Sequence, residues 1–458
     1  MRGSRSRWSR TSEQVTAFVH SLGLDAYLVG GAVRDELLGR LAKDQDFVVP
    51  GVGYAELRDA LAPHGRVEDL EVAGQRVGLR LYPRDGDLRA LAPAGIEFAP
   101  PRTERSTGPG RHDFEIVASP EISLQEDMGR RDFTINAIAK RLATGELLDP
   151  YGGERDLRAG VLRTVSPLSF REDPLRLVRG LRFVSQHDLE PDEDTLRQMR
   201  EEAPSIRLVS GERIGGGLTA DGLGELSKLL LGPHPAKALR LARDTGVLVE
   251  LLPEFEPTIG FDQGTPRQPY TLDEHIFRVV QGAADAGIAL EVRLAALMHD
   301  LAKPSEDGKH AELSAQLSAQ ILRRFRYPAR FQRRVNAVVR HHSFPLDDVD
   351  ALFARRMLAQ RGEEVARDLA QHKQVDLRAK NVPPEEHEAA AHLLRLLEEE
   401  QEHPHRLGDL AIDGGDLLEL GLAEGPEIGR VLRELLSAVV DDPTLNTREL
   451  LLERARSG

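Results

Sequence analysis

The chain has 458 residues, of which 40% are hydrophobic and 30% charged, as in a soluble globular protein of roughly two to four domains. It contains no cysteine, which excludes disulfides, thiolate zinc sites and cysteine nucleophiles and fits a cytoplasmic protein. No apolar run approaches roughly 18 residues, and no apolar segment follows the basic start, so we expect neither a membrane span nor a secretory signal. The net charge of −14 argues against a general nucleic-acid coat but permits a local basic surface.

The first predicted elements are an amphipathic helix over residues 11–27 and a strand ending at Leu28-Val29. Gly30 and Gly31 follow, and they let the backbone turn tightly and approach a ligand closely. Residues 32–38 have helical spacing and include Arg34. The N–H groups at the start of such a helix, beside a glycine turn, suit a phosphate.

Two aspartates come directly before the apolar strand residues 47–49. Asp44 and Asp46 are two positions apart, and such residues on a strand point to the same side. They would present two carboxylates together, a donor set that suits Mg²⁺ with substrate phosphates. A Gly-Gly turn or an Asp-x-Asp triplet alone would indicate only a loop.

In combination, the order GGAVRD…DQDF resembles the signature of the nucleotidyltransferases of the DNA polymerase β superfamily. Within this superfamily, the residues of the motif resemble those of the bacterial tRNA nucleotidyltransferase and poly(A) polymerase family. This resemblance implies that Asp44 and Asp46 hold two Mg²⁺ ions. It also implies that Gly30, Gly31 and Arg34 cradle the triphosphate of a nucleotide.

Further along the head we expect a helix over residues 54–62, strands over 66–81, and a strand over 96–99. Glu97 would face away from its apolar neighbours, and the family carries an acid here followed by an arginine. The resemblance therefore implies Glu97 as a third, weaker metal ligand and Arg102 as a nucleotide contact. A solvent-exposed strand glutamate is the alternative. Residues 103–114 resemble a flexible loop that the family links to addition of the terminal A.

Residues 126–139, EDMGRRDFTINAIA, predict a helix that begins near Asp132. Arg131, Asp132 and Asn136 resemble the family's ribose and triphosphate contacts. A capped surface helix is the alternative.

Residues 170–183, FREDPLRLVRGLRF, predict one further helix, with Glu172, Arg176 and Arg179 on one face. The Glu-Asp-x-x-Arg pattern resembles the protein template with which the family selects CTP and ATP. The resemblance then implies that Glu172, Asp173 and Arg176 read the base, with Arg179 as a further nucleotide contact. A helix stabilised by its own salt bridges is the alternative reading.

Beyond this helix, residues 211–214 resemble the next family motif, but GGGLTADGLG follows where the family continues as a helix. Three consecutive glycines make a continuous helix costly, so we expect a loop or insertion there. Residues 236–252 are predicted to be helical, and residues 257–270 resemble a linker.

The second half carries a separate set of candidate metal ligands. One histidine, a His-Asp pair and a later aspartate resemble an HD-type metal phosphohydrolase domain, with ligands His275, His299, Asp300 and Asp376. Such ligands would hold one or two divalent ions (Ni, Mn, Co or Mg) that activate water. His310 and His341 are further candidates for the second metal or for phosphate contacts. With 15 histidines in the chain, chance proximity is the alternative.

Two charged stretches complete the reading. Residues 323–340 contain seven arginines and no acid, and they are the best candidate for an RNA phosphate track, with a solvated face as the alternative. Residues 385–402 contain seven glutamates and predict an exposed helix at a domain boundary.

The resemblance covers nearly the whole chain and implies an α+β fold, a polymerase-β-like head followed by helical domains. The expected domains are the head over 11–155, a neck for base recognition and RNA binding over 156–256, an HD domain over 271–384, and a tRNA-binding tail over 385–458. The implied reaction is the attack of a tRNA 3′-hydroxyl on the α-phosphate of CTP or ATP, with release of pyrophosphate.

The alternatives are an enzyme that adds only A or only CC, which would need a complementary partner enzyme, or a poly(A) polymerase. From other classes, the chain could be chiefly an HD phosphohydrolase or a non-catalytic RNA-binding protein. Neither a membrane nor DNA is an expected partner.

Overall fold

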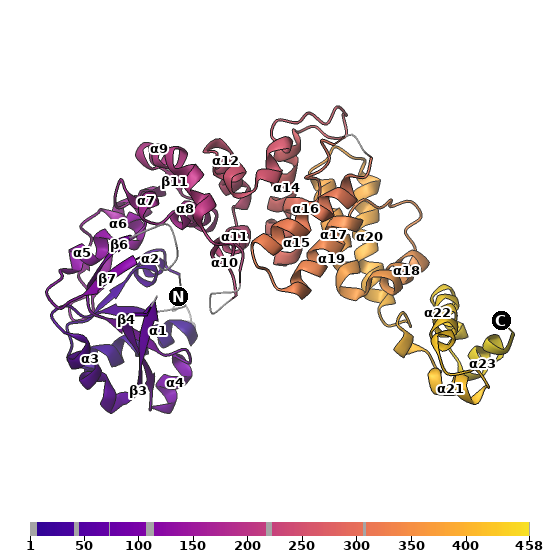
Figure 1. Cartoon of the computed structure of the whole chain (residues 1–458), viewed down its shortest axis with the longest axis horizontal. Coiled ribbons are helices and arrows are strands. Elements are labelled where there is room, and N and C mark those ends of the chain that lie inside the picture. Colours follow the sequence, from indigo (N-terminus) through magenta and orange to yellow (C-terminus); the bar gives the residue numbers. More distant parts are fainter. Residues whose placement is uncertain are drawn as a thin grey trace, which may run out of the picture. The chain divides into compact units, whose positions relative to one another are not determined.

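A computed structural model of the chain describes residues 7–40, 45–72, 74–106, 114–216, 222–305 and 308–457. The chain divides into two compact units, Met1–Pro253 and Glu254–Gly458 (Figure 1). Within the described ranges, no helix combines the length and apolar character needed to cross a membrane.

The first unit is built on a mixed seven-stranded sheet with the strand order β3-β4-β5-β2-β1-β8-β9. Its strands are β1 Tyr27–Val29, β2 Asp46–Val48, β3 Gly65–Val72, β4 Gln75–Pro83, β5 Ile96–Ala99, β8 Ala139–Arg141 and β9 Leu147–Leu148. Strands β2 and β5 run parallel, and the other neighbours in this sheet are antiparallel. Two small pairs lie outside the sheet: β6 Arg102–Ser106 with β7 Phe114–Ala118, and β10 Val161–Leu162 with β11 Glu190–Pro191.

Alternation along the central strands separates two apolar cores, one on each face of the sheet. Leu28 and Phe47 belong to the larger core, which also includes residues of α1 and α3. Val29 and Val48 belong to a smaller core with Leu124 and with Ala139 of β8. Because side chains two apart on a strand share a face, Asp46 lies on the side of Val48.

The helices of the first unit surround this sheet and continue beyond it. They are α1 Arg7–Ser21, α2 Gly31–Leu37, α3 Tyr54–Leu61, α4 Gly86–Leu91, α5 Leu124–Gly129, α6 Gly153–Ala159, α7 Ser169–Glu172, α8 Leu175–His187, α9 Glu193–Glu202, α10 Gly211–Ile214, α11 Glu225–Leu230, α12 Pro235–Asp244 and α13 Val247–Leu251. Short 3₁₀ segments of this unit are η1 Ala62–His64, η2 Thr134–Asn136 and η3 Ala203–Leu208, and η4 Pro253–Thr258 begins at its last residue and continues into the second unit.

Two helix predictions were wrong in detail. The helix expected to begin near Asp132 ends before it, at Gly129, and residues 134–136 form a single 3₁₀ turn. The single helix expected over 170–183 is two helices, α7 and α8, separated at Asp173-Pro174. Asp173 has an extended conformation (φ −144°, ψ 101°) because the ring of a following proline disfavours the helical region.

Within the described residues of the second unit, the regular elements are all helical. These are α14 Leu272–Asp285, α15 Leu290–Met298, α16 His310–Arg324, α17 Ala329–His341, α18 Ala351–Arg361, α19 Glu363–Arg378, α20 Pro384–Glu400, η5 Leu407–Asp409, α21 Gly414–Glu419, α22 Pro426–Asp441, η6 Pro443–Leu445 and α23 Arg448–Ser457. The expected α+β architecture, a mixed-sheet head followed by helical segments, is confirmed.

The acidic segment 385–402 is more than an exposed helix. It forms α20, and Leu393, Leu396 and Leu397 on its buried face join a core with α18 and α19. A separate core forms among α21, α22 and α23 around Leu417, Leu435 and Leu451.

Candidate functional site

The first unit contains a polar pocket of about 1150 Å³ that is strongly positive. Among its described lining residues, ten are Arg or Lys and four are Asp. Such an excess of fixed cations attracts a polyanion and lowers the cost of concentrating its charge in one place. Most of the predicted nucleotide contacts line it: Gly30, Gly31, Arg34, Asp46, Arg102, Arg131, Asp132, Asn136, Asp173, Arg176 and Arg179.

Strand register brings Asp46 to the glycine turn. Val29, the last residue of β1, pairs with Asp46, the first residue of β2, so Asp46 lies next to the residue that precedes Gly30, and both line the pocket. Gly30 has φ +69°, and a Cβ there would lie 2.6 Å from Nη1 of Arg131. Only glycine therefore fits this backbone conformation without displacing the arginine.

Of the other predicted carboxylates, Glu97 is described by the structure and Asp44 is not. Glu97 is the register partner of Asp46 on the parallel strand β5, as expected for adjacent acids. Its carboxylate is ion-paired with Arg80 and does not line the pocket. Asp44 and residues 107–113 of the predicted loop lie outside the described residues.

A chain of hydrogen bonds connects four side chains that line the pocket. Arg34 donates from Nη1 to Oδ1 of Asn136 at 2.7 Å, and Asn136 donates to Oδ1 of Asp132 at 2.9 Å. Arg179 donates from Nε to Oδ2 of the same aspartate at 2.8 Å. Hydrogen bonds to charged groups contribute about 1.5–3 kcal/mol each, so this chain fixes the positions of the side chains.

Electrostatics keep Asp132 ionised in spite of its burial. Burial alone would raise the pKa of this carboxyl, but the Arg179 guanidinium and the hydrogen bond from Asn136 outweigh it and hold the pKa well below the usual range. Burial, partly offset by Glu225, lowers the pKa of Arg182 to about 10. The guanidinium remains charged at neutral pH.

The predicted base-reading residues lie at the break between α7 and α8. Asp173 accepts from Nη2 of Arg213 at 2.8 Å and lines the pocket. Arg176 donates to Oγ of Ser169 at 3.0 Å and to the carbonyl oxygen of Arg130 at 2.6 Å. Glu172 lies 3.2 Å from Arg176 and does not line the pocket.

Several cationic residues of the pocket were missed from the sequence. Arg182 continues the three-residue spacing of Arg176 and Arg179 along α8, a signal that could have revealed it. Arg213 belongs to the motif GERI at residues 211–214, to which the sequence alone assigns no role. Lys228 follows the glycine-rich interruption, and no local pattern points to it.

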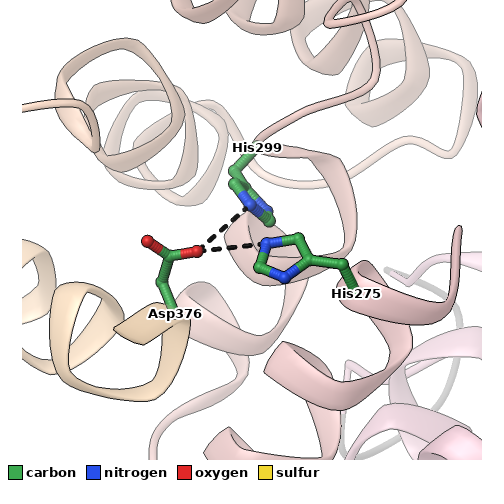
Figure 2. A group of neighbouring side chains, drawn as sticks. All are labelled: His275, His299 and Asp376. Atoms are coloured by element: carbon green, nitrogen blue, oxygen red, sulfur yellow. Dashed lines mark ion pairs between the residues drawn. The ribbon is translucent and has the colours of Figure 1, made fainter. Parts of the chain in front are cut away.

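The second unit brings the predicted HD ligands together in a buried cluster. His275 lies on α14, His299 directly follows α15, and Asp376 lies on α19. Figure 2 shows that one carboxylate oxygen of Asp376 faces both imidazoles, with Oδ1 at 3.1 Å from Nε2 of His275 and 3.8 Å from Nε2 of His299. These three ligand atoms lie close enough to hold one metal ion.

A second group of possible ligands adjoins the first. Oδ1 of Asp300 lies 3.3 Å from Nε2 of His342 and 3.6 Å from Nε2 of His310. His341, a candidate from the sequence for the second metal or for phosphate contacts, is not part of this group, and its Nε2 lies 3.0 Å from the Arg361 guanidinium. Successive helical residues point about 100° apart, so only one of the two adjacent histidines at the end of α17 can face the cluster.

Each aspartate of the cluster divides its two oxygens in the same way. Oδ2 of Asp300 accepts from Lys303 at 2.8 Å, and Oδ2 of Asp376 accepts from Lys380 at 2.6 Å. Their Oδ1 atoms are buried and have no hydrogen-bond partner among the described residues. The cluster therefore presents two carboxylate oxygens that a cation would satisfy.

The imidazoles present lone pairs toward the same space. Nδ1 of His299 lies 2.9 Å from the carbonyl oxygen of Ala296, and Nδ1 of His342 lies 2.7 Å from that of Val339. These contacts assign the proton to Nδ1 and leave Nε2 as an acceptor, the arrangement of metal-binding histidines. Burial lowers the pKa of His299 to about 3, so its Nε2 and the aspartate oxygens face one another as acceptors. A divalent cation fits this donor set.

The predicted RNA track along residues 323–340 is largely neutralised within its own unit. Four of its seven arginines pair with acids, namely Arg324 with Glu254, Arg330 with Glu364, Arg334 with Asp368, and Arg340 with Glu312. Its role in RNA binding stays a prediction.

Comparison with known proteins places these features in a family. The Poly A polymerase head domain family matches residues 26–163, an RNA- and SrmB-binding site of polymerase A matches residues 188–259, and a tRNA nucleotidyltransferase domain 2 matches residues 309–455. The multifunctional CCA protein of Nitrosococcus oceani is 36% identical over 70% of this chain and 75% of its own length. That of Chromobacterium violaceum is also 36% identical, over 70% and 74%.

Solved structures agree with this grouping. The Bacillus stearothermophilus CCA-adding enzyme in complex with CTP is 26% identical, covers 99% of this chain and 98% of its own, and has a TM-score of 0.67. The Thermotoga maritima CCA-adding enzyme in complex with tRNA is 21% identical, with coverages of 97% and 93% and a TM-score of 0.56, and it shares the fold.

The fold and the pocket define a nucleotidyltransferase, with a catalytic head followed along the chain by helical segments. The chain belongs to the family of multifunctional CCA proteins.

Proposed function

We infer that this chain is a tRNA nucleotidyltransferase that adds CMP and AMP from CTP and ATP to the 3′ end of tRNA and releases pyrophosphate. The observation that supports this best is a single pocket lined by Asp46 and Gly30 as well as by Asp173 and Arg176. Residues suited to the reacting phosphate and residues suited to a base thus share one volume. A part in tRNA processing agrees with the cytoplasmic location expected from the sequence.

At the reacting end, Asp46 would act with Asp44 as the carboxylate pair that holds metal. The family depends on divalent ions, and Mg²⁺ is the ion we propose, since carboxylates and phosphates are its preferred ligands. Bound there, Mg²⁺ would neutralise charge on the phosphates and help to activate the 3′-hydroxyl. Glu97, the register partner of Asp46, is proposed as a weaker third ligand.

Around the triphosphate and sugar, the residues of this chain would bind and orient. Arg34, Arg102 and Arg131 line the pocket as cations for the phosphate oxygens. Asn136 and Asp132 would meet the ribose hydroxyls, and the hydrogen bonds from Arg34 and Arg179 hold these two side chains in place. Because these side chains are ordered before the nucleotide binds, the entropic cost of binding is lower.

At the base, Asp173 and Arg176 would provide the selection. Cytosine and adenine each present an amino donor beside a ring-nitrogen acceptor on their Watson–Crick edges. A carboxylate accepts from the first, and a guanidinium donates to the second. Uracil and guanine reverse this order, so they would leave both protein groups unpaired. Arg179, held by Asp132, and Glu172, beside Arg176, would keep the pair oriented.

The test is incorporation of each of four labelled nucleoside triphosphates into a tRNA transcript that ends before CCA. The proposal predicts C addition followed by A addition, with U and G disfavoured by about 100-fold or more, since unpaired buried polar groups cost about 1–3 kcal/mol each. Comparable incorporation of all four nucleotides would contradict the assigned base contacts. Long A tails would indicate a poly(A) polymerase.

A second activity, metal-dependent phosphohydrolysis, is favoured by the cluster in the second unit. His275, His299 and Asp376 form one three-ligand group, and Asp300, His310 and His342 form the other. Divalent ions bound there would polarise a phosphate oxygen and lower the pKa of a water molecule. Imidazole-rich donors favour Ni²⁺, Co²⁺ or Mn²⁺ over Mg²⁺. Lys303 and Lys380 pair with the two aspartates and would place positive charge close to a bound phosphate.

Hydrolysis of a 2′,3′-cyclic nucleotide with each metal tests this second activity. We expect hydrolysis by the wild-type protein and its loss in the Asp376→Asn variant, while nucleotide addition by the head persists. Absence of hydrolysis with every divalent metal would overturn it.

A further inference from the structure

One more histidine belongs to the buried cluster of the second unit. His372 lies on α19, four residues before Asp376, so both side chains project from the same face of the helix. Its side chain is completely buried. Neither ring nitrogen has a hydrogen-bond partner among the described residues. A buried polar group without a partner is unfavourable, and this imidazole has two such nitrogens.

The neighbours of His372 come from both groups of candidate ligands. Its ring centroid lies 4.9 Å from that of His299, which belongs to the first group, and 5.7 Å from that of His342, which belongs to the second. The rings of His299 and His342 are themselves 5.1 Å apart. The three imidazoles therefore form a triangle at the junction of the two groups.

His299 and His342 each have Nδ1 at hydrogen-bond distance from a backbone carbonyl oxygen. His372 differs from both of them in this respect. A neutral imidazole offers one lone pair, and a cation held by the surrounding ligands would take up the lone pair of His372.

We propose that His372 is a metal ligand that joins the two groups, so that five imidazoles and two carboxylates hold a pair of divalent ions. The inference rests on the metal site proposed above and extends it to a residue outside both three-ligand groups. Its position on α19 ties the ion nearest His342 to the helix that carries Asp376. Loss of this side chain would then weaken metal binding without removing any other ligand.

The test is equilibrium dialysis of the full-length protein against Co²⁺ in excess Mg²⁺, which occupies the carboxylate site of the head. We expect His372→Gln and His372→Phe to bind fewer Co²⁺ ions, or to bind one ion about 10-fold or more weakly. The matched control is His341→Asn, which replaces the neighbouring histidine that contacts Arg361, and it should bind as wild type. Wild-type Co²⁺ binding in both His372 variants would overturn the proposal.

Asp376→Asn separates this proposal from the one on which it depends. If neither the wild-type protein nor this variant binds Co²⁺, the metal site itself is absent. CCA addition and circular dichroism report folding of every variant.

A measurement on the wild-type protein needs no substitution. With ¹⁵N-histidine labelling, Zn²⁺ should change the ¹⁵N chemical shifts of five imidazoles. A change in only four, with His372 unaffected, would also overturn the proposal.

Discussion

The guanidinium of Arg213 lies 2.8 Å from Oδ2 of Asp173 and holds that carboxylate at the edge of the nucleotide pocket. Arg213 comes from α10 and Asp173 from the break between α7 and α8, so the contact joins two segments 40 residues apart. Asp173 is one of the two residues to which we assign base selection. Arg213 is therefore a positioning residue for that selection.

Replacement of Arg213 by Ala should reduce the discrimination of CTP and ATP against UTP and GTP by about 10- to 100-fold, because the freed carboxylate loses a contact worth about 1.5–3 kcal/mol. The ratios of kcat/KM for the four nucleotides measure this effect. Arg207→Ala is the matched control, since Arg207 pairs with Glu250 and lines no part of the pocket. Unchanged ratios in Arg213→Ala would show that Asp173 does not depend on this contact.

Gly30→Ala should damage both stability and nucleotide binding. A side chain at φ +69° costs about 1–2 kcal/mol, and the added Cβ would displace the Arg131 guanidinium. We expect the unfolding free energy to fall by about that amount and the KM for CTP to rise several-fold. Urea unfolding and steady-state kinetics check the two effects. Gly86→Ala, at a position with open space, should change neither.

The carboxylates of adjacent strands should differ in their contributions to catalysis. Asp46→Asn should reduce kcat by about 10³-fold or more, since removal of a metal-holding carboxylate costs several kcal/mol. Glu97→Gln should cost less, about 10- to 100-fold, because its carboxylate is also ion-paired with Arg80. Single-turnover incorporation of CMP gives both values. Glu68→Gln, a strand carboxylate paired with Arg66, is the control. A fully active Asp46→Asn protein would exclude the assigned reaction centre.

His187 should make the first unit sensitive to acid. Burial, together with Arg34, Arg40 and Arg182, lowers the pKa of His187 from 6.5 to about 3. Above pH 6.5 the imidazole is neutral in both the folded and the unfolded chain, and its full contribution to stability is present. As the pH falls below this value, the unfolded chain takes up a proton that the folded chain accepts only near pH 3, so stability is lost.

The prediction is that His187→Gln loses less thermal stability than wild type between about pH 7.5 and about pH 5. Thermal unfolding at a series of pH values measures the difference. His403→Gln, at an exposed histidine of the second unit, should follow wild type. Parallel pH dependences of wild type and His187→Gln would show that His187 is not the responsible group.

Removal and replacement of metal should separate the two activities. Chelation should abolish both nucleotide addition and hydrolysis of a 2′,3′-cyclic nucleotide. Mg²⁺ alone should restore the first, because the head offers carboxylates, while Ni²⁺ or Co²⁺ should be needed for the second, because the cluster offers imidazoles. Full recovery of both activities with Mg²⁺ alone would contradict the assignment of the two donor sets.

The sequence predicted the parts of the site that depend on local pattern. Alternation along β2 and β5 placed Asp46 and Glu97 on one side of their strands, and the register pairs them. The HD ligands also came together as expected, since each lies on or directly after a helix of the second unit. Fold class, family and reaction followed from the order of these motifs.

The errors came from geometry that a linear pattern does not contain. The predicted helix over 170–183 included Pro174, although a proline disfavours the helical conformation at the residue before it. His341 was named where His342 contacts the cluster, because the orientation of α17 is set by packing against other helices. His372 has no motif at all, and only its burial and its neighbours reveal it.

The central claim is tested most directly with three tRNA transcripts that end before CCA, after C and after CC. Each is incubated with Mg²⁺ and labelled CTP or ATP, and the products are resolved at single-nucleotide length. The account predicts that all three are extended to CCA. Extension of only the CC-ended transcript with ATP would show an A-adding enzyme that needs a partner, and no extension of any transcript would contradict the assignment of the head as a nucleotidyltransferase.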